Sequence, residues 1–248
     1  MKNVIVFFLV LILITLLCVT LIVIIQHDID YPNNYDHINA SKFYNSNLNI
    51  SDIVVSFTTM PKRLKQETLK CTINSFLNQT VRAQEIRINI PSILKKSGET
   101  YEIPQWLTET PITIVRCDDE GPATKYLPTI RHFQNSQQKI FICDDDQIYT
   151  KHTIETYQKL TKQYPNFAIG AEGAKLKNHT FDERTMISNG TIRIFPRLKD
   201  SSFVNVLYGS GGYCIKANMV DISFLENFQQ LPKEAFFVDD IVMSGGMS

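Results

Sequence analysis

Short apolar runs alternate with amphipathic stretches through the middle of the chain, and this alternation limits the fold more than any other feature. Residues 53–57 (IVVSF) and 139–143 (KIFIC) are continuous apolar runs, and residues 85–90 (EIRINI) alternate up to Pro91. Between the first two strands, residues 66–78 place apolar side chains at helical spacing. The order β-α-β, loop, β-α-β predicts an open, mostly parallel sheet covered by helices.

The remaining elements complete this pattern. We expect a third strand at 112–116, a helix at 126–135 and another helix from about 152 to 163. Beyond residue 167 the apolar runs are shorter (FAIGAEG, TIRIF, FVNVLYGSGGYCIKA), which indicates a mixed second half. The sequence therefore predicts an α/β fold with a mostly parallel, mixed sheet.

The first 25 residues have a different character. Residues 4–25 contain no charged side chain, and as a helix they would span about 33 Å, enough to cross a hydrocarbon core of about 30 Å. The run is longer than the usual core of a signal peptide, and no small-x-small cleavage site follows it. Lys2 precedes the run, while Asp28 and Asp30 follow it. This charge pattern places the N-terminus in the cytosol.

These features divide the chain into three parts: a transmembrane signal-anchor at 1–25, a polar stem at 26–50 and a globular domain at 51–248. The sequence predicts a single-pass, type II membrane protein whose domain is lumenal or extracytoplasmic. Asn-x-Ser/Thr triplets are consistent with that location, although an Asn- and Thr-rich chain also produces them by chance. The four cysteines beyond the anchor either form bridges or remain buried thiols. With 25 basic and 25 acidic residues, nothing indicates a nucleic-acid partner.

Three consecutive carboxylates, Asp144 to Asp146, directly follow the KIFIC run. Ligands of open α/β sheets bind beyond the carboxyl ends of the strands, which is where these residues fall. If they continue the strand, Asp144 and Asp146 point to one side and Asp145 to the other. Two carboxylates on one side suit a divalent ion that completes its coordination with water and substrate phosphates, and such an ion neutralises a diphosphate leaving group. In isolation, a solvated acidic turn or a helix cap is the alternative interpretation.

A second acidic pair, Asp239 and Asp240, lies in the apolar sequence FFVDDIV. Apolar surroundings raise a carboxyl pKa, as a general base working near neutral pH requires. A helix N-terminus, where acidic residues interact favourably with the helix dipole, explains the pair equally well.

Two loops add candidate residues. The segment 121–125 (GPATK) makes a tight turn and displays Lys125 near a helix start, where phosphate is readily bound; an ordinary surface lysine is the alternative. The segment 209–213 (GSGGY) lets backbone approach a ligand closely, or simply forms a hairpin.

Taken in order, the segments VVSFTTMPKRL, SFLNQT, EIRINIP, YEIPQWL, DDEGPATKYLPTI, FICDDDQIY, GSGGYCIKA and FFVDDIV resemble the family-2-like glycosyltransferases with a GT-A fold, from about residue 51 to 243. The resemblance implies that Asp144 and Asp146 hold Mn²⁺ or Mg²⁺ and the diphosphate of a nucleotide sugar. It implies further donor-binding residues: Thr58, Thr59, Arg63, Asp118, Lys125 and Asp145. It also places Gly211 and Gly212 beside the donor sugar and acceptor, and implies inversion with Asp240 as the base and Asp239 as the alternate.

The resemblance thus implies a metal-dependent enzyme that moves a sugar from a nucleotide-diphosphate donor to a hydroxyl of a glycan, protein or lipid acceptor. Similar proteins continue past the acidic pair with a further helix and loop, whereas this chain stops at Ser248. A catalytically degenerate, membrane-anchored protein that binds nucleotide sugars or glycans is therefore one alternative. A metal-dependent phosphoryl or nucleotidyl transferase is another, although the sequence lacks a P-loop or kinase signature.

Overall fold

The structure is a computed structural model that describes residues 38–174, 203–227 and 239–247. The predicted anchor at 1–25, the first part of the predicted stem and the TIRIF segment lie outside these residues. Within the described part, none of the helices has both the length and the apolar character that crossing a bilayer requires.

A six-stranded sheet forms the centre of the domain, in the order β5-β2-β1-β6-β10-β7. Its strands are β1 (Ile53–Thr58), β2 (Glu85–Pro91), β5 (Thr113–Cys117), β6 (Lys139–Ile142), β7 (Ile169–Gly170) and β10 (Tyr213–Lys216). The first four strands along the sheet pair in parallel, and β10 runs antiparallel to both of its neighbours. The predicted mixed, mostly parallel sheet is confirmed.

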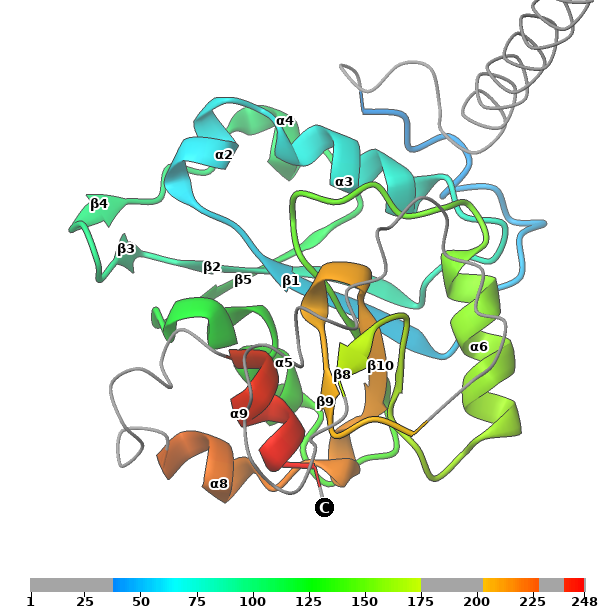
Figure 1. Cartoon of the computed structure of the whole chain (residues 1–248). Coiled ribbons are helices and arrows are strands. Elements are labelled where there is room, and N and C mark those ends of the chain that lie inside the picture. Colours follow the sequence, from blue (N-terminus) through cyan, green and yellow to red (C-terminus); the bar gives the residue numbers. More distant parts are fainter. Residues whose placement is uncertain (1–37, 175–202, 228–238, 248) are drawn as a thin grey trace, which may run out of the picture.

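Helices cover both faces of this sheet (Figure 1). The α-helices are α2 (Pro61–Lys65), α3 (Leu69–Leu77), α4 (Gln105–Thr108), α5 (Leu127–His132), α6 (Thr153–Gln163), α8 (Ile222–Glu226) and α9 (Asp239–Gly245). Three 3₁₀ segments are η1 (Gly121–Lys125), η2 (Gly209–Gly211) and η3 (Ala217–Met219). Two small antiparallel pairs, β3 (Ile93–Leu94) with β4 (Glu99–Thr100) and β8 (Gly173–Ala174) with β9 (Val206–Leu207), complete the described elements.

Two apolar clusters lie on opposite faces of the sheet, because successive side chains of a strand point to opposite sides. Phe141 of β6 joins the cluster that contains α3 and α6, whereas Ile140 and Ile142 join the cluster that contains α5, α8 and α9. The helices α5, α8 and α9 therefore pack on the face of the sheet opposite α3.

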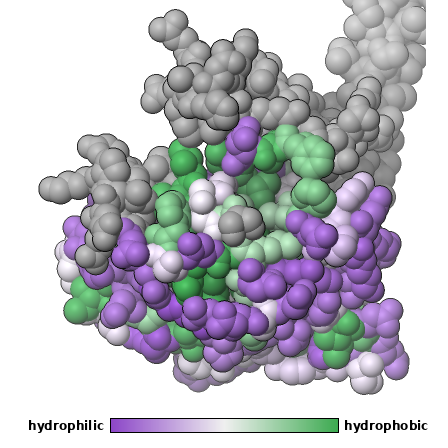
Figure 2. Space-filling view, turned by 90° about the horizontal axis from the view of Figure 1, so that it is seen from below, coloured by the Kyte–Doolittle hydropathy of each residue, from purple (hydrophilic) through white to green (hydrophobic). Residues whose placement is uncertain are grey.

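Figure 2 views the molecule from below: most of that face is hydrophilic, with apolar side chains gathered toward its middle.

The helix predicted at 66–78 is broken near its start. Glu67 has a left-handed backbone (φ 57°), which separates α2 from α3. Non-glycine residues rarely adopt this conformation, and the periodicity of the apolar residues gave no sign of it. The helix predicted at 126–135 is also shorter, since α5 ends at His132 and Asn135 again has a left-handed backbone (φ 65°).

The cysteines of the described residues form no bridge. Cys71, Cys117, Cys143 and Cys214 are not disulfide-bonded, and the last two are buried. Of the two interpretations that the sequence left open for them, the structure shows unbridged thiols.

Candidate functional site

The candidate site lies at the edge of the sheet where the parallel strands end. Thr59 follows β1, Asp118 follows β5 and Asp144 follows β6 at this edge. The antiparallel strand β10 begins here, because its first residue, Tyr213, is paired with Ile142, the last residue of β6. The Gly209–Gly212 loop that precedes β10 is therefore brought to the same edge.

The three aspartates form a turn and do not continue the strand, which ends at Ile142. The Tyr149 hydroxyl lies 3.2 Å from both the backbone nitrogen and the backbone oxygen of Asp144. From α3, the Thr72 hydroxyl donates to the backbone oxygens of Asp145 (2.7 Å) and Gln147 (2.8 Å). Strand alternation therefore does not set the directions of the three carboxylates; the turn sets them.

Asp145 points inward and is only 5% exposed. Its carboxylate accepts a hydrogen bond from the Thr59 hydroxyl and forms an ion pair with Arg63. Burial raises the pKa of Asp145, although the Thr59 hydrogen bond and the Arg63 charge oppose that effect. Thr59, Arg63 and Asp145, three of the predicted donor-binding residues, are thus brought together, with Asp145 in a supporting position beneath the surface.

Asp146 lies on the outer side of the turn, with a side chain that is 48% exposed. Arg63 Nη2 is 2.9 Å from Asp146 Oδ2, so one guanidinium contacts both Asp145 and Asp146. Asp144 pairs instead with Lys125. The sequence predicted that Asp144 and Asp146 point to one side and Asp145 to the other. The ion pairs instead group Asp145 with Asp146, through Arg63, and leave Asp144 with Lys125.

Lys125 is an interior residue, with a side chain that is 8% exposed. Its backbone oxygen accepts hydrogen bonds from the Ser56 hydroxyl of β1 (2.7 Å) and from Asn89 Nδ2 of β2 (3.3 Å). These two bonds fix the end of η1 on the sheet, from which the side chain reaches the acidic residues. The interpretation of Lys125 as an ordinary surface lysine is therefore wrong.

The ammonium of Lys125 is surrounded by carboxylates. Its Nζ lies 2.9 Å from Asp144 Oδ1, 2.8 Å from Asp239 Oδ2 and 3.9 Å from Asp240 Oδ1. Burial alone would lower the pKa of the Lys125 ammonium, but the charges of Asp239, Asp144 and Asp240 together outweigh it and raise the pKa. The lysine therefore stays charged and joins the two acidic segments that the sequence singled out separately.

Asp239 and Asp240 occupy the first turn of α9, as the helix-dipole interpretation expected. Asp240 Oδ1 accepts a hydrogen bond of 3.0 Å from the backbone nitrogen of Gly209. Burial raises the pKa of Asp240 to about 6, with Lys125 opposing and Asp239 adding to the shift. Asp240 thus also has the property that a general base near neutral pH requires.

Gly209 is the glycine of the loop that lies against this cluster. A Cβ atom at Gly209 would lie 2.7 Å from Lys125 Nζ and 3.1 Å from Asp240 Oδ1. Gly211 and Gly212, which the resemblance placed beside the donor sugar, have other close neighbours. A Cβ at Gly211 would approach Ala171, and one at Gly212 would overlap the ring of Phe141.

Two predicted residues lie at the edge but outside these contacts. The Thr58 hydroxyl donates to the backbone oxygen of Asn89 (2.7 Å). Asp118 is exposed, and its neighbour Asp119 is the buried one, accepting from the backbone nitrogens of Lys95 (2.7 Å) and Gly121 (2.9 Å). Asp119 therefore shapes the turn that leads into Lys125.

No protein-family model matches the chain, and no curated protein matches it. Among solved structures, the crystal structure of residues 1–349 of S. aureus TarS matches with a TM-score of 0.43 and 11% sequence identity. The match covers 79% of this chain and 54% of that chain, so this chain spans about half the length of the TarS structure. At this similarity the match assigns no function, and we base the function of the site on its own residues.

The metal ion that the sequence predicts at the aspartate turn stays a prediction. Within the described residues, no group of three or more His, Cys, Asp or Glu side chains could hold a metal ion. Mg²⁺ needs fewer protein ligands, because it is commonly bound by one or two carboxylates with waters and substrate phosphates. Asp144 and Asp146 are partly exposed carboxylates, but each is paired with a different cation, Lys125 and Arg63 respectively.

Several residues that build the site were not expected from the sequence. Thr72, Ser56 and Asn89 are buried polar residues within apolar segments, and a polar residue at such a position is the signal that marks them. Gly209 could not be told apart from the other glycines of its loop, because the distinction depends on the distance to Lys125.

Proposed function

We propose that the chain is a glycosyltransferase that moves a sugar from a nucleotide-diphosphate sugar to a hydroxyl of an acceptor. The observation that carries the proposal is the meeting of two acidic segments at one edge of the sheet. Asp144, from the turn after β6, and Asp239, from the start of α9, both contact the ammonium of Lys125. A site for a diphosphate and a general base are then neighbours, as sugar transfer requires.

In this proposal Asp240 is the base. Its carboxylate takes the proton from the acceptor hydroxyl while the acceptor oxygen forms a bond to the anomeric carbon. The bond between that carbon and the diphosphate oxygen breaks, and its electron pair leaves with the nucleoside diphosphate. Attack opposite the leaving group inverts the anomeric centre. The raised pKa of Asp240, about 6, suits this role, because a base works best when its pKa lies near the working pH.

The donor side of the proposal consists of the aspartate turn and its neighbours. Asp144 and Asp146 would hold Mg²⁺ or Mn²⁺, which supplies charge neutralisation for the diphosphate. Arg63, 34% exposed beside Asp146, would contact a phosphate oxygen, while Asp145, which accepts a hydrogen bond from Thr59, holds Arg63 in position. We also propose that residues 1–25 anchor the protein as a type II membrane protein with this domain on the lumenal or extracytoplasmic side.

A panel of UDP-, GDP- and dTDP-linked hexoses, incubated with Mn²⁺, tests the proposal by release of the nucleoside diphosphate. We expect turnover with at least one donor, loss of turnover with EDTA, and loss in Asp146→Ala with an unchanged circular dichroism spectrum. Unchanged turnover in Asp146→Ala would reject the metal assignment. Calorimetric binding of a donor without any release would favour the non-catalytic binding protein, and turnover of nucleoside triphosphates alone would favour the phosphoryl or nucleotidyl transferase.

A further inference from the structure

The sequence suggested that Lys125 binds donor phosphate, but its surroundings in the structure argue against that role. One ammonium contacts three carboxylates, those of Asp144, Asp239 and Asp240. The positive charge of Lys125 is therefore already balanced by carboxylates, which leaves no net positive charge on the ammonium for a donor phosphate. The ammonium also has little access to solvent, because the side chain is 8% exposed.

We propose that Lys125 is a positioning residue: it fixes Asp239 and Asp240 relative to Asp144 and does not bind the donor itself. Two bonds of similar length, 2.9 Å to Asp144 and 2.8 Å to Asp239, place the ammonium between the turn after β6 and the start of α9. The backbone of Lys125 is in turn held on β1 and β2 by Ser56 and Asn89. Lys125 therefore fixes the start of α9 relative to the central sheet.

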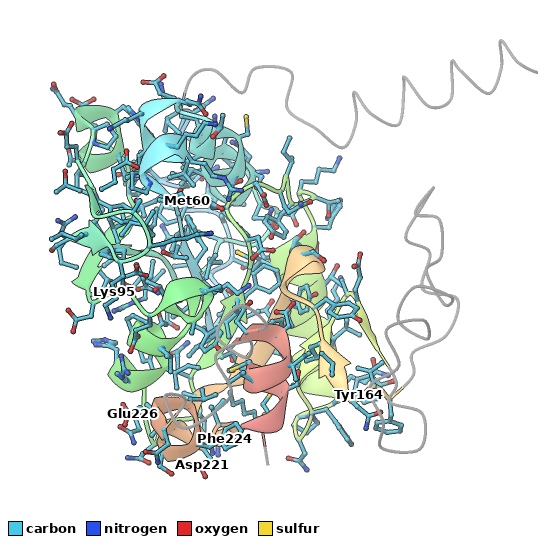
Figure 3. The ribbon with its side chains drawn as sticks, turned by 60° about the vertical axis from the view of Figure 1, so that its left-hand side comes forward. Met60, Lys95, Tyr164, Asp221, Phe224 and Glu226 are labelled. Carbon is cyan, nitrogen blue, oxygen red and sulfur yellow. The ribbon has the colours of Figure 1, made fainter. Side chains whose placement is uncertain are left out.

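The other end of α9 is attached independently of Lys125. The backbone nitrogen of Asp221 donates to the backbone oxygen of Gly246 (2.8 Å), and Leu207 donates to the Ser244 hydroxyl (3.0 Å). Phe224, which Figure 3 labels together with Asp221 on the segment below α9, lies against Gly245 and Gly246. Loss of the Lys125 contacts would consequently release the first turn of α9 and leave its last turn in place.

Gly209 provides a second way to disturb the same contacts. The ammonium of Lys125 and the carboxylate of Asp240 occupy the space beside Gly209 where a Cβ atom would extend, at 2.7 and 3.1 Å. An alanine at this position would displace one of them without removing any charge. Gly245 is the matched control, because a Cβ there would meet only Phe224, at an ordinary 3.5 Å.

Hydrogen exchange measured by mass spectrometry on the full chain tests the positioning role without any substrate. Lys125→Met and Gly209→Ala should both raise exchange at residues 243–244, whose backbone nitrogens donate to the carbonyls of residues 239 and 240, and leave Gly246 and Met247 as they are in the unchanged chain. Gly245→Ala should show no such rise. Exchange at residues 243–244 that stays the same in both variants would overturn the proposal. If Lys125→Met fails to fold, Gly209→Ala decides the question alone.

A kinetic test rests on the proposed function and separates positioning from donor binding. With an active donor from the panel and Mn²⁺, both variants should lose roughly a hundredfold in kcat, as expected of a misplaced catalytic group, while the donor Kd from calorimetry changes by less than about threefold. A Kd that weakens as much as kcat/KM falls would make Lys125 a donor ligand and overturn the proposal. If the unchanged chain turns over no nucleotide sugar, the proposed function fails, and hydrogen exchange still decides the role of Lys125.

Discussion

Nζ of Lys125 lies 2.8 Å from Oδ2 of Asp239, and both side chains are largely buried. Buried ion pairs contribute little net stability, because desolvation of the two charges offsets their attraction. Removal of one partner, however, leaves the other charge buried without a counter-charge. Each residue of the pair therefore depends on the other for its position.

The first prediction concerns stability. Lys125→Met should lower the free energy of unfolding by about 3 kcal/mol, because Asp239 is left without its cation. Lys65→Met removes an exposed pair with Glu99 and should cost less than about 1 kcal/mol. Urea unfolding followed by circular dichroism measures both, and equal losses in the two variants would contradict the assignment of Lys125 to the interior.

The neighbouring aspartates of the turn should respond differently to truncation. Asp145→Ala removes a buried carboxylate that binds Thr59 and Arg63, and should cost about 2–3 kcal/mol. Asp146→Ala removes a half-exposed carboxylate and should cost less than about 1 kcal/mol. Thermal unfolding of the two variants side by side checks the order, and a larger loss in Asp146→Ala would show that the turn is oriented otherwise.

If the chain transfers sugar as proposed, the pH dependence of the rate should reveal Asp240. Because its pKa is raised to about 6 and the base must be ionised, the rate should fall as the pH drops through about 6. The folded chain also binds more protons than the unfolded chain between the ordinary pKa of 3.8 and about 6, so the contribution of this group to stability declines as the pH rises through that window. Initial rates from about pH 5 to about pH 8 provide the test. A rate that stays constant on the acid side would exclude Asp240 as the base.

Gly212 should tolerate no side chain. Its backbone is left-handed (φ 75°), and a Cβ atom would overlap the ring of Phe141 in the core. Gly212→Ala should therefore lower the free energy of unfolding by about 2–3 kcal/mol, whereas Gly245→Ala should stay within about 0.5 kcal/mol of the unchanged chain. Chemical denaturation compares the two variants. An unchanged free energy of unfolding in Gly212→Ala would mean that the loop before β10 rearranges freely.

The sheet could be predicted from the sequence because its strands carry local signals. The IVVSF, EIRINI and KIFIC segments became β1, β2 and β6 within one or two residues of the expected bounds. The break between α2 and α3 could not be predicted, since Glu67 adopts a left-handed backbone that its residue type does not favour.

The site was predictable as a set of segments but not as a set of contacts. The position of the aspartates at the end of a buried strand followed from the sequence pattern. The pattern also marked the acidic pair at 239–240 as a candidate site. The partner of each carboxylate did not, because Lys125, Asp144 and Asp239 come from three distant segments. Their contacts depend on how the 3₁₀ segment η1 and helix α9 pack, and no local pattern encodes those distances.

The late position of Asp239 and Asp240 in the sequence also bears on how the protein is made. Domains fold while they emerge from the ribosome, N-terminal parts first. Strands β1, β2, β5 and β6, with the aspartate turn, are synthesised well before strand β10 and helix α9. A nascent chain can therefore form the aspartate turn and present Lys125 before Asp239 and Asp240 are available to pair with it.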